Sequence, residues 1–266
     1  MDNYRANDGA AYEIFLGRWS RQLAEPFLDF ARFTPEGELL DAGCGTGSLA
    51  RAMGGRWPGR RILGIDIAPS YVAFARSRAG SPGLAFAVGD LCRLPCASGC
   101  FAGAAAQLSL NFATDPERAA GELRRVSRPG GVVAACVWDF RGGLVYQRLL
   151  WDSAAAIDPQ AARVRDRLFS APLALPDGLT NLFERTGLSQ VERASLTIRM
   201  EYEDFADYWQ PLLGGQGPVG SYVAGLSPER RAAVEALVRA AYLSGAADGP
   251  RSLAAAAWAV RGILPG

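Results

Sequence analysis

The sequence predicts an α/β fold in which a doubly wound, mostly parallel sheet of seven strands carries helices on both faces. Short apolar runs alternate with stretches of helical periodicity, which is typical of βα units. The first apolar run breaks into a turn with glycine at 43, 45 and 47, and a helix follows from about Ser48. Glycines at these positions allow the main chain to approach a ligand closely.

The βα units can be placed along the chain by their apolar runs. We expect strands near 38–42, 61–66, 84–88, 102–108, 131–138, 190–201 and 254–263. We expect helices near 48–55, 69–79, 116–127, 178–186 and 228–243. The turn Pro129-Gly130-Gly131 is expected to end a helix and start a strand.

The whole chain, 1–266, is long enough for one α/β domain without a second core. Aromatic residues recur at helical spacing within residues 1–35, which predicts an N-terminal helical cap. Residues 36–140 hold the ligand-binding core. Residues 141–177 and 202–252 are too long for simple connections, so we expect helical, substrate-side insertions that act as a lid.

The charge composition excludes several chemistries. All 28 basic residues are arginine, so the chain has no lysine that could form a Schiff base or serve in a P-loop. It also has no histidine, so neither a histidine base nor a histidine metal ligand is possible. The net charge of +1 favours neither nucleic acid nor a membrane surface. No apolar run approaches the roughly 20 residues of a membrane span.

Five cysteines, an odd number, favour free thiols and a reducing cytoplasm. Cys92, Cys96 and Cys100 stand four apart, but structural zinc needs four ligands and no histidine completes the set. Pro95 also argues against one continuous helix there. We therefore expect no metal.

The residues around the glycine turn distinguish between nucleotide ligands. A dinucleotide site needs a third small residue where Ser48 stands, whereas here the glycines alternate. Asp41, just before the turn, would repel a pyrophosphate and suit an ammonium group. Asp66 ends the next strand, where a carboxylate can accept both hydroxyls of a ribose.

At this point the sequence resembles the class I S-adenosylmethionine (SAM)-dependent methyltransferases, in the branch that includes ubiquinone and menaquinone biosynthesis enzymes. Their first motif reads acid-x-Gly-x-Gly-x-Gly, and the resemblance continues through Gly89-Asp90-Leu91 and the run 125–131. It covers roughly residues 10–140. It implies a Rossmann-like sheet whose last strand, near Ala256 to Val260, is inserted antiparallel.

The resemblance also implies roles for individual residues. Asp66 would bind the ribose, Asp90 the adenine amino group, and Arg18 the methionine carboxylate of SAM. The implied cofactor contacts are Tyr12, Arg18, Trp19, Asp41, Ala42, Gly43, Gly45, Asp66, Ile67, Asp90, Leu91 and Gln107. The expected substrate contacts are Asn111, Phe112, Tyr146, Tyr208 and Trp209.

The implied function is methyl transfer from SAM to an O, N or C atom of a quinone-like or natural-product small molecule, leaving S-adenosylhomocysteine (SAH). Alignment in a dry site can drive this displacement. No residue is singled out as catalytic; Tyr12, Glu13, Tyr146 and Tyr208 are candidate bases. A nicotinamide-dependent reductase and a non-catalytic SAM-binding protein remain alternatives. We expect a monomer or a homodimer that binds no nucleic acid.

Overall fold

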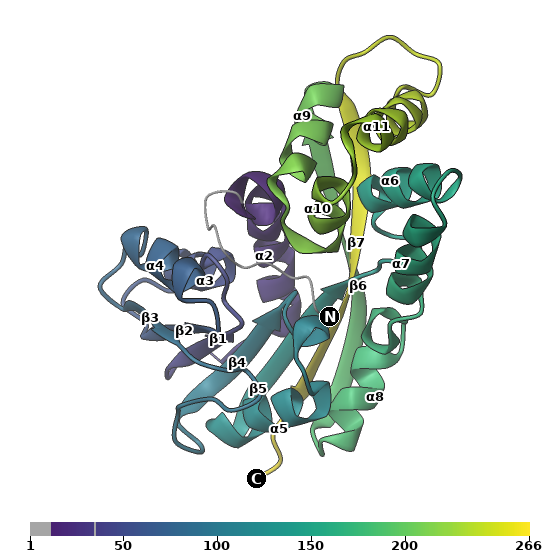
Figure 1. Ribbon diagram of the computed structural model, residues 1–266. Coiled ribbons are helices and arrows are strands. Elements are labelled where there is room, and N and C mark those ends of the chain that lie inside the picture. Colours follow the sequence, from purple (N-terminus) through teal and green to yellow (C-terminus); the bar gives the residue numbers. More distant parts are fainter. Residues whose placement is uncertain (1–11, 35) are drawn as a thin grey trace.

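One sheet runs through the molecule in the order β3-β2-β1-β4-β5-β7-β6 (Figure 1), in a computed structural model that describes residues 12–34 and 36–266. Its strands are β1 (Leu39–Ala42), β2 (Ile62–Asp66), β3 (Leu84–Val88), β4 (Phe101–Gln107), β5 (Ser127–Trp138), β6 (Ser189–Tyr202) and β7 (Arg251–Ile263). The pairs from β3 to β5 are parallel, and β7 pairs antiparallel with both β5 and β6. The predicted seven-stranded sheet with its inserted last strand is confirmed.

The helical elements also follow the predicted order. They are η1 (Glu13–Gly17), α2 (Arg18–Ala31), α3 (Ser48–Arg56), α4 (Pro69–Ser77), η2 (Leu110–Phe112), α5 (Pro116–Val126), α6 (Val145–Ala155), α7 (Pro159–Phe169), η3 (Pro172–Ala174), α8 (Gly178–Arg185), α9 (Phe205–Trp209), η4 (Gln210–Gly214), α10 (Gly217–Ala224) and α11 (Pro228–Leu243). The part of the predicted N-terminal cap at 1–11 lies outside the described residues.

The expected turn at Pro129-Gly130-Gly131 is wrong in one respect. Helix α5 ends at Val126 and β5 begins at the next residue, so the three residues lie inside the strand. The register against β4 shifts between the pairs Phe101–Ser127 and Gly103–Val132. A bulge, with Gly130 at φ 74°, therefore replaces the separate turn.

The sheet has an apolar core on each face because successive residues of a strand point to opposite sides. Leu39 packs in the core beneath α2, α3 and α4, whereas Leu40 packs beneath α5 and α8. In β5, Val132 packs in the same core as Leu39, and Val133 packs in the same core as Leu40. This near-continuous apolar pattern is typical of parallel strands buried on both faces.

The insertions gather at the carboxyl edge of the parallel strands. Helices α6 and α7 follow the end of β5, and α9 to α11 connect the end of β6 to the start of β7. Because β6 runs parallel to β5, this connection lies at the same edge. Figure 1 shows α6, α9, α10 and α11 grouped around the upper ends of β6 and β7. They build a helical layer beside the ends of β1, β2 and β4.

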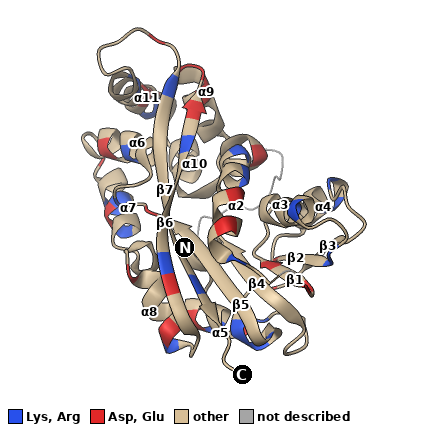
Figure 2. Cartoon of the chain, turned by 180° about the vertical axis from the view of Figure 1, so that it is seen from behind, with Lys and Arg blue, Asp and Glu red and all other residues tan. Residues whose placement is uncertain are grey.

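The surface carries both charges without a dominant sign. Figure 2 shows acidic and basic residues interspersed over the helices and along β6 and β7. None of the helices in the described ranges is long and apolar enough to cross a membrane.

Candidate functional site

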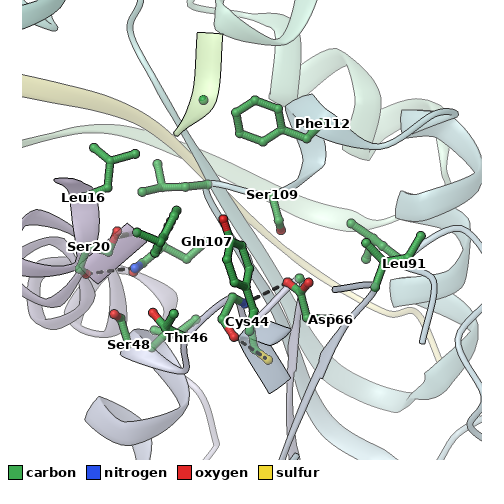
Figure 3. A pocket seen from close by; sticks show the side chains of 18 of the residues that line it. Leu16, Ser20, Cys44, Thr46, Ser48, Asp66, Leu91, Gln107, Ser109 and Phe112 are labelled. Carbon is green, nitrogen blue, oxygen red and sulfur yellow. Dashed lines mark hydrogen bonds between the residues drawn. The ribbon is translucent and has the colours of Figure 1, made fainter. Parts of the chain in front are cut away.

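A cleft of about 340 Å³ opens at the carboxyl edge, where the turns after β1, β2, β3 and β4 meet the start of η1 and α10. Open α/β sheets bind their ligands at this edge. Figure 3 shows the side chains of Leu16, Leu91 and Phe112 around the open centre, with Asp66 and Gln107 between them. The cleft is therefore formed by segments distant in the sequence.

The glycine turn after β1 forms one wall of the cleft. Gly43, Gly45 and Gly47 all have positive φ, at 74°, 53° and 85°. A Cβ atom on Gly43 would lie 2.3 Å from the Cβ of Ser109, so that position has no room for a side chain. Gly45 has open space beside it, since its nearest neighbour would be a Tyr12 ring atom at 4.0 Å. The backbone at Gly45 is thus exposed to a ligand.

Asp66, at the end of β2, fixes the shape of this wall. Its Oδ2 accepts the Gly45 N–H at 2.8 Å, and its Oδ1 accepts the Ala68 N–H at 2.9 Å. Burial raises the pKa of Asp66, and the two backbone hydrogen bonds lower it in part. Each oxygen keeps a further lone pair, so the carboxylate can still accept two hydroxyls from a ligand.

Asp41 lies beneath the glycine turn, 1% exposed at the end of β1. Its Oδ2 accepts the Ala50 N–H at 3.0 Å, whereas Oδ1 has no partner among the described residues. Burial raises the pKa of Asp41 to about 7; the Ala50 hydrogen bond opposes this shift and the nearby Asp66 adds to it. The group is therefore divided between its acid and carboxylate forms near neutral pH.

Unpaired polar atoms gather at this end of the cleft. Gln107, at the end of β4, donates through Nε2 to the Ser20 carbonyl at 2.9 Å. The Asp41 Oδ1, Ser20 Oγ, Ser48 Oγ and Gln107 Oε1 atoms are buried without a hydrogen-bond partner in the described chain. All four residues line the cleft. Buried polar atoms are rarely left unpaired, so this end of the cleft suits a polar ligand.

The turn after β3 forms the opposite wall. Asp90 Oδ1 accepts the Cys92 N–H at 2.8 Å, which holds the carboxylate at the start of the turn. Leu91 lines the cleft beside it. Ile67 also lines the cleft and is 67% exposed, so its apolar side chain is open to cover a flat ring. This wall combines one carboxylate with apolar surface.

The N-terminal segment covers the glycine turn. The Tyr12 ring lies 5.1 Å from the Tyr71 ring, and both side chains line the cleft. The Thr46 hydroxyl donates to the Glu13 carboxylate, which joins η1 to the turn. Tyr12 therefore lies at the cleft, and its contact with a cofactor stays a prediction.

Two predicted cofactor contacts on α2 lie elsewhere. Arg18 donates to both carboxylate oxygens of Asp207, at 3.0 and 3.1 Å, and its guanidinium lies 4.2 Å from the Trp19 ring centroid. Trp19 is 4% exposed and packs against Tyr202. Both residues face α9 and β6, so Arg18 is an ion-pair partner of the insertion and does not line the cleft.

Other predicted contacts are also displaced from the cleft. Tyr146, Tyr208 and Trp209 are at most 3% exposed and join the apolar core between the insertion helices. Ala42 lies in the core below the turn, where its carbonyl accepts the Ser109 hydroxyl. Asn111 is not among the lining residues described, whereas Phe112 is. Aromatic periodicity marked the buried face of each helix and did not indicate the cleft.

Sequence reasoning missed several lining residues. Gln147 lines the cleft one position after the predicted Tyr146, and Trp138 and Phe140 come from the end of β5. Leu108 follows β4 with φ 59°, a conformation that is unusual for leucine and that marks the bend of this strand into the cleft. Leu108, Trp138 and Phe140 could have been found by their place at or just after strand ends, whereas Gln147 lies inside α6 and carried no such signal.

The three spaced cysteines make local contacts. Cys92 Sγ lies 3.4 Å from the Asp115 carbonyl, and Cys100 Sγ lies 3.1 Å from the Ala97 carbonyl. All five cysteines are free thiols. The described residues contain no group of three or more His, Cys, Asp or Glu arranged for a metal ion.

Part of the chain is similar to a known protein family. Residues 40–135 match the family model described as a methyltransferase domain. A malonyl-[acyl-carrier protein] O-methyltransferase of Pectobacterium atrosepticum is 36% identical over 36% of this chain and 37% of its own length. A demethylmenaquinone methyltransferase of Thermus thermophilus is 37% identical over 43% of this chain and 51% of its own. The chain thus spans about a third to a half of the length of these relatives.

Solved structures extend the similarity to the whole fold. A phosphoethanolamine N-methyltransferase 2 of Haemonchus contortus, in complex with SAM, has a TM-score of 0.62 at 15% identity. That alignment covers 100% of this chain and 58% of the other. The fold, the ordered glycine and acid motifs and the domain match agree: residues 40–135 are similar to a methyltransferase domain, and the sheet has the class I SAM-dependent methyltransferase fold.

Proposed function

We propose that the protein binds SAM in the cleft and transfers its methyl group to a small molecule. The observation that carries the proposal is the grouping of unpaired polar atoms and carboxylates along one wall. A ligand with an ammonium group, a ribose and an adenine offers hydrogen-bond donors to each of them. SAM is such a ligand and carries no phosphate for Asp41 to repel.

The residues fit SAM in three groups. Asp66 would hold the ribose hydroxyls through the lone pairs left by its two backbone hydrogen bonds. Asp90 and Leu91 would meet the adenine, and Ile67 would cover the ring. Asp41 and Gln107 would serve the methionine end, where their Oδ1 and Oε1 atoms lack partners within the described residues.

SAM supplies an electrophilic methyl group on a sulfonium, and the protein contributes alignment and exclusion of water. Tyr12, Leu16 and Val219 line the cleft above the glycine turn and would cover the bound cofactor. Burial raises the pKa of Tyr146 and Tyr208, which opposes their use as bases. We propose that proximity drives the transfer and that any proton leaves to solvent.

The relatives' names indicate where to search for the acceptor. One acts on a malonyl group on an acyl-carrier protein and another on demethylmenaquinone. Our proposal is a quinone-like or natural-product small molecule, and a malonyl thioester belongs in the same panel. Residues 36–140 would hold SAM, and the insertions 141–177 and 202–252 would face the acceptor.

Mass-spectrometric turnover of such a panel with SAM tests the proposal. We expect one acceptor to gain a methyl group with stoichiometric formation of SAH, and an Asp66→Ala variant to lose most of this turnover. Binding of SAM without transfer to any acceptor would favour a non-catalytic SAM-binding protein. Oxidation of NADH with a carbonyl acceptor would favour a reductase.

A further inference from the structure

The part of the cleft beyond the glycine turn has a distinct chemistry, and we name it the acceptor chamber. Aromatic and aliphatic side chains dominate it, with a single amide among them. Its walls are Phe15, Leu16, Phe112, Trp138, Phe140 and Gln147. The charged side chains that line the cleft, Asp41, Asp66 and Asp90, all belong to the opposite, cofactor end. Within the described residues, no charged side chain lines the chamber.

Basic residues near the chamber are engaged elsewhere. Arg18 forms its ion pair with Asp207, and Arg21 pairs with Glu13. Arg51 donates to the Thr46 carbonyl at 2.6 Å. An anionic acceptor would therefore lose its hydration without gaining a cation among the described residues, and burying an unpaired charge is strongly unfavourable. The chamber favours a neutral molecule.

Gln147 supplies the chamber with one oriented polar atom. Its Nε2 donates to the Tyr146 hydroxyl at 3.0 Å. Tyr146 is itself held, because the Tyr208 hydroxyl donates to the Tyr146 carbonyl at 2.7 Å and the Tyr146 ring packs edge-on against Phe15. One of the two N–H groups of the amide is thereby occupied. The amide oxygen of Gln147 makes no hydrogen bond within the described chain and is available to accept one.

Trp138 adds a second polar atom to the same chamber. It is 4% exposed, and its indole Nε1–H has no acceptor in the part of the chain that the structure describes. Buried indole N–H groups usually find a partner. The Trp138 nitrogen is itself buried, so Gln147 supplies the polar atoms that the apolar walls offer to a ligand.

We infer that the methyl acceptor is a neutral, largely apolar molecule and that the Gln147 amide oxygen selects it by accepting a hydrogen bond from its hydroxyl or amino group. This inference rests on the proposed function, because it assigns the chamber to the acceptor of that methyl transfer. It makes Gln147 a specificity-determining residue and excludes carboxylate acceptors. An amide oxygen cannot take a proton, so Gln147 positions the acceptor and does not serve as its base.

The test compares two aromatic probes of similar size on protein saturated with SAH. At about pH 7.5, 2-naphthol is neutral and 2-naphthoate is an anion. By calorimetry we expect 2-naphthol to bind at least about tenfold more tightly than 2-naphthoate. Gln147→Leu should weaken 2-naphthol about fivefold or more, the loss expected for one hydrogen bond. Gln147→Arg should instead strengthen 2-naphthoate.

Gln160→Leu, at an exposed position on α7, is the matched control and should change neither probe. SAH affinity, measured on every variant, shows whether the fold and the cofactor site are intact. Tighter binding of 2-naphthoate, no effect of Gln147→Leu, or no binding of either probe to the SAH complex would each overturn the inference while leaving the proposed function standing. Failure of SAH to bind would instead contradict the proposed function, and the inference with it.

Discussion

Two buried carboxylates dominate the site at the scale of single residues, and Asp66 is the more exposed to ligand. We expect Asp66→Ala to weaken SAH binding by about 1–3 kcal/mol through loss of charge-assisted hydrogen bonds. Asp66→Asn keeps one oxygen acceptor and should lose less. Calorimetry measures both, with Asp29→Ala as a surface control because Asp29 pairs with Arg56 on the exposed side of α2. An Asp66→Ala variant that is folded and binds SAH normally would refute the ribose assignment.

Asp41 should make stability depend on pH. Burial raises its pKa to about 7 in the folded protein, above the value of about 4 for an unfolded chain. The folded state therefore binds the proton more tightly, so this contribution is full below about pH 4 and is lost as the pH rises through 7. Relative to Asp41→Asn, the free energy of unfolding of the wild type should fall by up to about 1.4 kcal/mol per pH unit in that window.

Urea unfolding of both proteins at several pH values measures this difference. Other ionisable groups contribute to both curves and largely cancel. Parallel pH profiles for wild type and Asp41→Asn would show that Asp41 titrates normally.

Site residues on the glycine turn and at strand ends could be predicted because their chemistry is local. Gly43, Asp66 and Asp90 occupy positions that the chain fixes within a few residues. Gln147 could not be found in this way, since a one-residue difference on α6 decides whether a side chain meets the cleft or the core. Tyr146 is the predicted contact, yet its aromatic ring packs inside the core.

At the scale of elements, we expect the addition of a single methyl group to disrupt the glycine turn. Gly43→Ala combines positive φ with a Cβ placed 2.3 Å from Ser109 Cβ. We expect SAH affinity to fall by more than about tenfold, with a loss of stability of about 1 kcal/mol or more. Gly99→Ala is matched in backbone strain, with φ 69°, but its Cβ meets nothing within 4 Å.

Thermal unfolding and SAH titration of the two glycine variants distinguish the effect of backbone strain from that of the steric clash with Ser109. Gly99→Ala should lose stability and keep its affinity for SAH. Equal SAH affinities for the two variants would mean that the turn tolerates a side chain at Gly43.

Most strands and helices agree with prediction because their periodicity is long and their ends carry clear signals. Helix α11 begins and ends as predicted, with Ser227 as an N-cap that accepts the Arg230 N–H. The start of β5 differs from the prediction. The strand already pairs with β4 at Ser127, before the bulge at Gly130, so the proline and glycines do not separate helix from strand. The region 141–177, for which the sequence predicts only a helical insertion, forms two helices and a 3-10 turn.

At the scale of the whole molecule, the insertions and the N-terminal helix close the cleft together. Tyr12, Phe15 and Leu16 line it next to Gly217 to Val219 of α10, where a Cβ on Gly217 would lie 3.7 Å from the Phe15 ring. We expect hydrogen exchange in 12–20 and 215–220 to slow when SAH is added, because closure expels water from the site. The segment 205–209 should change little, since Tyr208 and Trp209 are already buried.

Mass-spectrometric hydrogen exchange with and without SAH gives this comparison directly. Residues 228–243 on α11 serve as a reference helix remote from the cleft. Unchanged protection of 12–20 and 215–220, with SAH binding confirmed, would mean that these segments are ordinary core packing and do not form a lid.

The packing of the insertions could not be predicted from sequence because it depends on contacts across long separations. Arg18 and Asp207 are 189 positions apart in the chain, yet their ion pair joins α2 to α9. A motif can indicate that an arginine lies near a cofactor, but only the fold shows which carboxylate it meets. Local sequence signals determine the βα core, whereas tertiary contacts determine how the insertions and α2 pack over it.

The central claim is that the cleft is a SAM site, and calorimetric titration of the purified chain with SAH tests it most directly. NADH is the comparison ligand, since it shares the adenosine but carries a pyrophosphate. We expect one saturable site for SAH, weakened in Asp66→Ala, and no measurable heat from NADH. Absence of SAH binding to folded protein, or tighter binding of NADH, would contradict it.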